Sequence, residues 1–76
     1  MIPEHSRVVL TADMPADSLR AGDVGTVVHI YENSVAYEVE FINLSGDTVA
    51  VATVEADQLR PIASSDLTHA RSLVAA

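Results

Sequence analysis

Paired carboxylates are the first candidate chemistry in this sequence. Glu38 and Glu40 lie two residues apart in the run AYEVEFI, which is typical of a strand, so both side chains leave one face about 7 Å apart. With Asp47 or Glu55 from a neighbouring strand, they would supply the oxygen ligands that Ca²⁺ or Mg²⁺ prefers. A solvated strand face explains the same residues without a ligand. We therefore expect no cofactor or metal and keep a divalent-cation site as the alternative.

A second acidic set lies earlier in the chain. Asp13, Asp17 and Asp23 surround Arg20 in sequence. They could form a cation site or accept an Arg or Lys from a partner, although turn formation and capping use the same residue types. A long first loop often frames the binding groove of a small barrel, so we expect partner contacts here.

The remaining polar residues do not predict catalysis. The three histidines have no metal-ligand spacing: His5, His29 and His69. Four of the serines are candidate nucleophiles but have neither an elbow motif nor a marked His and acid partner: Ser6, Ser18, Ser34 and Ser45. The chain also has no cysteine, which removes thiolate metal sites and a cysteine nucleophile. We expect a protein that is not an enzyme.

Two tyrosines flank a predicted turn at residues 32–36. Tyr37 alternates with Val39 and Phe41 and should point into the core. Tyr31 is then the better candidate to present aromatic surface to a peptide. An exposed edge strand offers another route, because it can add a partner strand through main-chain hydrogen bonds.

The charge balance limits the partners. Four arginines, no lysine and eleven acidic residues give a formal net charge of −7. Nucleic acids and anionic membranes attract cationic faces, so we expect no DNA and no membrane. An RNA-binding barrel is a second alternative, which the charge disfavours. A basic protein partner fits this charge better.

The elements that position these residues are short strands. Seventy-six residues make one domain, and β-branched runs broken by turn residues predict an all-β, small five-stranded SH3-like barrel over residues 1–62. The expected strands are 7–11, 24–31, 36–42, 48–54 and a short last strand, closed by Pro61, after a helical turn. Residues 63–76 would form a short C-terminal helix or a frayed tail.

Alternation along the strands predicts the interior. In the run 48–54, Val49 and Val51 share one side, and Ala50, Ala52 and Val54 share the other. We assign the valine side, 49 and 51, to the core. The expected core is Val8, Leu10, Val24, Val27, Ile30, Tyr37, Val39, Phe41, Val49, Val51 and Leu59.

Two glycines frame the entry to the second strand. Gly22 and Gly25 enclose Asp23 and Val24, and a corner of this kind needs a positive φ or a close backbone approach. The glycine-containing block is one of four that, in this order, resemble a known family: EHSRVVLT, LRAGDVGTVV, AYEVEF and ADQLRP.

The family is a group of small bacterial proteins known only as domain of unknown function 4926. The resemblance covers residues 2–62, and the residues after Ile62 lie outside it. It implies an SH3-like fold, occasional pairing of such genes with those of toxin-like or other uncharacterised proteins, and no catalytic residues.

These observations predict a non-catalytic protein-binding module, an antitoxin, immunity-type or accessory protein that binds a basic partner. The start MIPEH lacks the basic and apolar regions of a signal peptide, so we expect a cytoplasmic protein. A homo-oligomer stays open. The expected contacts are Asp13, Asp17, Arg20, Asp23, Tyr31, Glu38 and Glu40.

Overall fold

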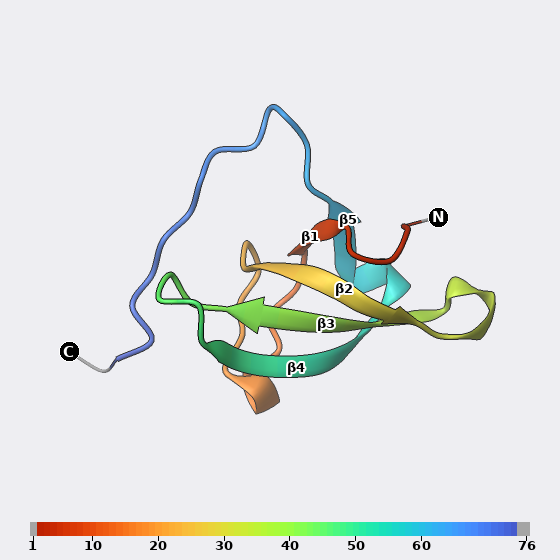
Figure 1. Ribbon diagram of the computed structural model, residues 1–76, viewed down its shortest axis with the longest axis horizontal. Coiled ribbons are helices and arrows are strands. Elements are labelled where there is room, and N and C mark those ends of the chain that lie inside the picture. The colour runs from red at the N-terminus through yellow and green to blue at the C-terminus, as the bar shows by residue number, and fades with distance from the viewer. Residues whose placement is uncertain (1, 75–76) are drawn as a thin grey trace.

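Five antiparallel strands form a single sheet in the structure, a computed structural model that describes residues 2–74 (Figure 1). They are β1 (Arg7–Leu10), β2 (Val24–Ile30), β3 (Ala36–Ile42), β4 (Thr48–Glu55) and β5 (Leu59–Pro61). Short 3₁₀ turns interrupt the connections: η1 (Pro15–Asp17), η2 (Glu32–Ser34) and η3 (Ala56–Gln58). The predicted all-β class with five strands is confirmed, and each strand ends within one residue of its expected bounds.

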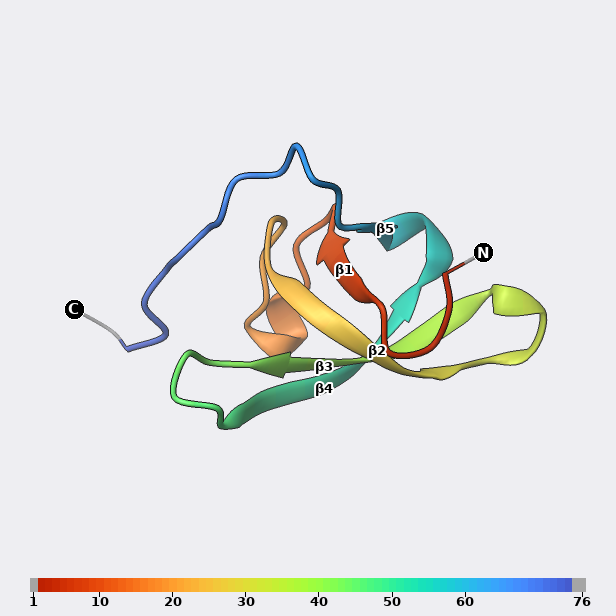
Figure 2. The same cartoon turned by 45° about the horizontal axis from the view of Figure 1, so that its top comes forward.

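The strand order is β4-β3-β2-β1-β5. The sheet curls so that β1 and β5 lie over the broad surface of β2, β3 and β4 (Figure 2). β1 pairs with β2 on one side and with β5 on the other. Within residues 2–74 there is no helix long and apolar enough to cross a membrane.

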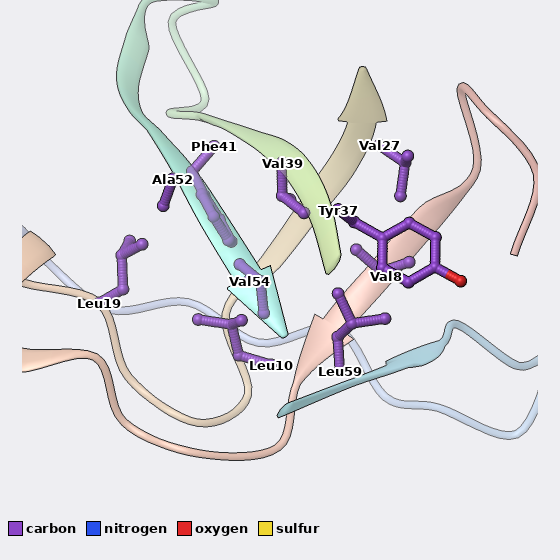
Figure 3. Packing of buried hydrophobic residues seen from close by; sticks show 10 residues of the cluster. All are labelled: Val8, Leu10, Leu19, Val27, Tyr37, Val39, Phe41, Ala52, Val54 and Leu59. Carbon is purple, nitrogen blue, oxygen red and sulfur yellow. The ribbon is translucent and has the colours of Figure 1, made fainter. Parts of the chain in front are cut away.

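The core lies inside this curl. Figure 3 shows side chains from β1, β2, β3, β4 and β5 converging there, with Val8, Val27, Val39 and Val54 almost fully buried. Removing apolar surface from water stabilises the fold by about 25 cal/mol per Å². The buried cluster is Val8, Leu10, Leu19, Val27, Tyr37, Val39, Phe41, Ala52, Val54 and Leu59.

The prediction for the inner face of β4 was wrong. Val49 and Val51 are 40% and 51% exposed, whereas Ala52 and Val54 are buried. The cause is the register with β3, in which Tyr37 lies opposite Val54, Val39 opposite Ala52 and Phe41 opposite Ala50. Directly opposed residues point to the same face of a sheet. The large inward side chains of β3 therefore bring the Ala50, Ala52 and Val54 side of β4 inward, and the small alanines leave room for them.

Other deviations from the expected core are small. Val24 and Ile30 are half-buried rather than buried. Leu19 was placed in a loop but is only 3% exposed. Its backbone N–H and C=O both bond to Met14, and this closed loop holds the Leu19 side chain against the sheet.

The two glycines before and within β2 serve different needs. Gly22 has a φ of +96°, which favours glycine over residues with a Cβ. Gly25 has an ordinary φ, but a Cβ there would lie 2.5 Å from Val39 Cγ1 and 2.9 Å from Phe41 Cε1. The first glycine permits the turn that carries Asp23, and the second permits β3 to pack closely over β2.

The segment after β5 forms no helix or strand in residues 63–74, which we call the tail. The predicted short helix is therefore absent from this part, and residues 75 and 76 lie outside the described range. The tail begins with an ion pair in which Arg60 donates two hydrogen bonds to Asp66, at 2.9 and 2.8 Å. Asp66 also accepts a bond from the Ala63 N–H. The tail then runs toward the β3–β4 turn (Figure 1).

A pair of matched substitutions tests the inward face of β4. Val54→Ala should lower the free energy of unfolding by about 2 kcal/mol, because it removes buried methyl groups and leaves a cavity. Val51→Ala makes the same change on the exposed face and should cost less than about 1 kcal/mol. Urea denaturation measures both, and equal losses would contradict the register.

Candidate functional site

Asp23 is the buried carboxylate of the domain, 9% exposed, at the end of the first loop (residues 11–23). The loop places it through two turn interactions. Arg20 N–H donates to Asp23 Oδ2 at 2.8 Å, and Asp23 N–H donates to the Arg20 carbonyl at 3.0 Å. Asp13 Oδ1 accepts a bond from the Ala21 N–H at 2.9 Å. Asp13 and Asp23 therefore fix the loop, as turn-forming acids do.

The cation at Asp23 comes from the tail and not from the neighbouring Arg20. Arg71 Nε donates to Asp23 Oδ1 at 2.9 Å, and Arg71 Nη2 donates to Asp23 Oδ2 at 2.7 Å. Nη2 also donates to the Ser18 carbonyl at 3.0 Å. His69 Nε2 lies 3.5 Å from Asp23 Oδ1. A guanidinium that bonds both carboxylate oxygens is the strongest ion-pair geometry that side chains form.

This pairing sets the charge state of the site. The hydrogen bonds from Arg71 lower the pKa of Asp23 below its ordinary value; burial opposes this effect, and the Arg20 N–H adds to it. In the same pair, Asp23 raises the pKa of Arg71. Both groups are therefore charged at neutral pH, and the buried carboxylate is neutralised by its partner.

Apolar surface adjoins this ion pair. A cavity of about 450 Å³ has Asp23 and Arg71 in its wall together with Leu19, Phe41 and Leu73. A second recess, of about 550 Å³, is lined by first-loop residues and by residues 71–74. Tail residues thus line both cavities, and the site combines the Asp23–Arg71 ion pair with an apolar cavity beside it.

The structure divides the predicted contact residues into two sets. Asp13 and Asp23 share the first loop with Asp17 and Arg20. Neither the Asp17 carboxylate nor the Arg20 guanidinium forms an ion pair within residues 2–74. Asp23 is therefore the centre of this set.

The second set lies on the outer face of β3 and beside it. Glu38 Oε1 accepts bonds from Tyr31 Oη at 3.2 Å and from Thr53 Oγ1 at 2.7 Å. Glu40 Oε2 accepts a bond from Thr48 Oγ1 at 2.7 Å. These hydroxyl groups, from Tyr31 after β2 and from Thr48 and Thr53 of β4, hydrogen-bond the carboxylates, so the set has a structural explanation.

The cation-binding alternative finds no ligand set in the described part of the chain. No three His, Asp or Glu side chains among residues 2–74 lie close enough together to hold a metal ion. The expected approach of Asp47 or Glu55 to the two glutamates does not produce such a group.

Sequence reasoning missed the tail's part in the site. Arg71 lies 48 residues from Asp23, and no local pattern predicts a contact over that separation. One signal was available: with only four arginines against eleven acids, any buried carboxylate has few cations to pair with.

The fold and site together define a small all-β domain with a buried carboxylate that holds a guanidinium. Residues 4–61 match the family described as "Domain of unknown function (DUF4926)", and the chain belongs to this family. No curated protein and no solved structure matches the chain. Asp23 thus lies within the family domain, whereas Arg71 lies beyond the matched residues.

Loss of the Asp23 charge should release the tail. Asp23→Asn keeps the side chain's shape but removes the charged pair with Arg71, and hydrogen bonds to charged groups contribute about 1.5–3 kcal/mol each. We expect the side-chain Nε–H signal of Arg71 in ¹⁵N NMR spectra to move to its solvent-exposed position. Asp17→Asn, in the same loop, is the matched control and should leave that signal unchanged. An unaltered Arg71 signal in Asp23→Asn would show that the carboxylate does not hold the tail.

Acid should release the tail in the same way. The folded-state pKa of Asp23 is lowered from 3.8, and that of Asp66 is lowered to about 2 by its bonds from Arg60 and Ala63. Because these carboxyl groups have lower pKa values in the folded state than in the unfolded state, their ionised forms stabilise the fold above pH 3.8. This stabilisation is lost as the pH falls through the folded-state pKa values. A pH titration of the arginine side-chain signals measures this, and release above pH 5 would be inconsistent with it.

Proposed function

We propose that this domain is a non-catalytic protein-binding module that holds an arginine of a basic partner at Asp23. The observation that carries the proposal is the bidentate pair between the family domain's Asp23 and an arginine from outside the matched residues. Without a guanidinium, Asp23 would lose its two hydrogen bonds from Arg71, one at each carboxylate oxygen, and its buried charge would be poorly compensated. The domain therefore offers a binding site for the guanidinium group of a partner's arginine.

The geometry favours arginine over lysine. Two carboxylate oxygens and the Ser18 carbonyl accept three bonds from one guanidinium. An ammonium group is a point charge that cannot match this planar fork. Because Leu73 and Val74 line the adjoining cavity, the favoured ligand is an extended segment with an apolar residue two or three positions after the arginine.

The remaining features support a role as an accessory protein. A net charge of −7 accelerates association with a basic partner and selects against acidic ones. The long first loop, the 3₁₀ turn before β5 and the pairing of β1 with β5 fit an SH3-like barrel, in which such a loop frames the ligand groove. An antitoxin or immunity-type protein of the bacterial cytoplasm fits these properties.

Peptide binding to three full-length chains tests the proposal. A fluorescent peptide with the sequence Arg-Ser-Leu-Val should bind Arg71→Ala, whose receptor is empty, and bind the unsubstituted chain at least about tenfold more weakly. The tail competes there at an effective concentration in the millimolar range. The double variant Arg71→Ala with Asp23→Asn should not bind.

Two controls make the outcome specific. The peptide Lys-Ser-Leu-Val should bind Arg71→Ala more weakly than the arginine peptide, and affinity should fall with added salt. Equal affinity for both peptides, or undiminished binding to the double variant, would reject an arginine receptor at Asp23.

A further inference from the structure

The β4 strand has an open side. It pairs with β3 and stands at the end of the sheet. The Ala56 N–H bonds to the Val35 carbonyl at 3.0 Å, and in an antiparallel ladder the bonded pairs alternate. In this register, Ala50, Ala52 and Val54 exchange bonds with β3. The backbone N–H and C=O groups of the intervening residues 51, 53 and 55 therefore face the open side.

This edge lacks the usual protection against strand pairing. Residues 48–54 contain no charged residue and no proline, although native edge strands are commonly blunted by one or the other. Val49 and Val51 are exposed along it, at 40% and 51%. The opposite edge, β5, is only three residues long and contains Arg60 and Pro61. Of the two sheet edges that residues 2–74 form, only β4 offers a long run of free backbone groups.

From this edge we propose that the chain forms a homodimer in which β4 pairs antiparallel with β4 of a second copy. An antiparallel pair of identical strands is self-complementary about a two-fold axis. Pairing centred on Ala52 joins the outward backbone groups of Val51 to those of Thr53 in the other copy. It also places Glu55 opposite Val49, so no two carboxylates face each other. The result is one continuous ten-stranded sheet.

The charge distribution permits a second copy to pair at this edge, although each chain has a formal net charge of −7. The contact strand itself is neutral over residues 48–54. Glu38 and Glu40 lie on β3, and the two β3 backbones would be three strand spacings apart, about 14 Å. Glu55, at the end of β4, faces Val49 of the other copy rather than a carboxylate. That separation exceeds the screening length of about 8 Å at physiological salt. Residual repulsion between the copies means that added salt strengthens the dimer, whereas it weakens binding of a basic partner at Asp23.

Sedimentation velocity of the full chain tests the dimer. Between about 10 µM and 1 mM, we expect a reversible monomer–dimer equilibrium that shifts toward dimer as salt rises from about 0.05 to 0.5 M. A monomer at every concentration would overturn the proposal. So would growth beyond a dimer, which would indicate pairing of β4 with β5 in an open chain of subunits.

A proline substitution tests the edge. The Val51 N–H faces the open side, so Val51→Pro removes a donor that the monomer does not use. We expect it to abolish the dimer, while Val51→Thr, which retains the N–H, should preserve it. A Val51→Pro chain that still dimerises would overturn the assignment.

Amide hydrogen exchange of the unsubstituted chain gives a second measurement that needs no variant. The amides of Val51 and Thr53 should exchange about tenfold or more slowly at the high concentration than at the low one. The Ala52 amide, which bonds to β3, is the internal control for local exchange within the monomer. Concentration-independent exchange at Val51 and Thr53 would also overturn the proposal.

Discussion

Burial of the three large side chains of β3 is the constraint on which the rest of the structure depends. Tyr37, Val39 and Phe41 alternate along a strand that pairs with β2 on one side and β4 on the other. Their size determines what the neighbours can present. Gly25 of β2 has no Cβ because Val39 and Phe41 occupy that space, and β4 presents alanines opposite Phe41 and Val39. One strand thus sets the inward faces of two others.

The same constraint leads to the site. Gly25 of β2 packs against Val39 and Phe41 of β3, and three residues earlier the chain turns at Gly22, where φ is positive. That turn carries Asp23 to a position beside Leu19 and Phe41, which line the same cavity. A carboxylate held at the edge of a core is costly unless a cation and hydrogen bonds compensate it. The position of Asp23 at the edge of this core therefore requires a cation, which Arg71 supplies.

Most of the fold was predictable from the sequence because alternation and turn residues are local patterns. The strand at residues 36–42 was predicted with its bounds because its apolar and acidic residues alternate without interruption. The strand at 48–54 gave the wrong face because both of its sides are apolar, and only the register with β3 distinguishes them.

The candidate site was predictable in part, for a related reason. The first loop was predicted to bind a cation or to accept an Arg or Lys from a partner, and Asp23 was among its named acids. Its partner was not identified, since the loop's own Arg20 lies nearer in sequence and Arg71 reaches the site only through the path of the tail. Residues 63–74 have no regular secondary structure, so no periodic pattern marks that path.

The two ion pairs of the tail determine what a partner must supply. Arg60 to Asp66 fixes the start of the tail, and Arg71 to Asp23 fixes it near the far end. An incoming arginine that displaces Arg71 exchanges one bidentate pair for an equivalent one, so that exchange adds little net affinity. The incoming segment also loses translational and rotational freedom, which the tethered tail does not. Release of the ordered tail offsets part of this cost. The remaining favourable free energy of binding must come from apolar contacts in the cavity. Selectivity at this site therefore depends on the residues that follow the arginine.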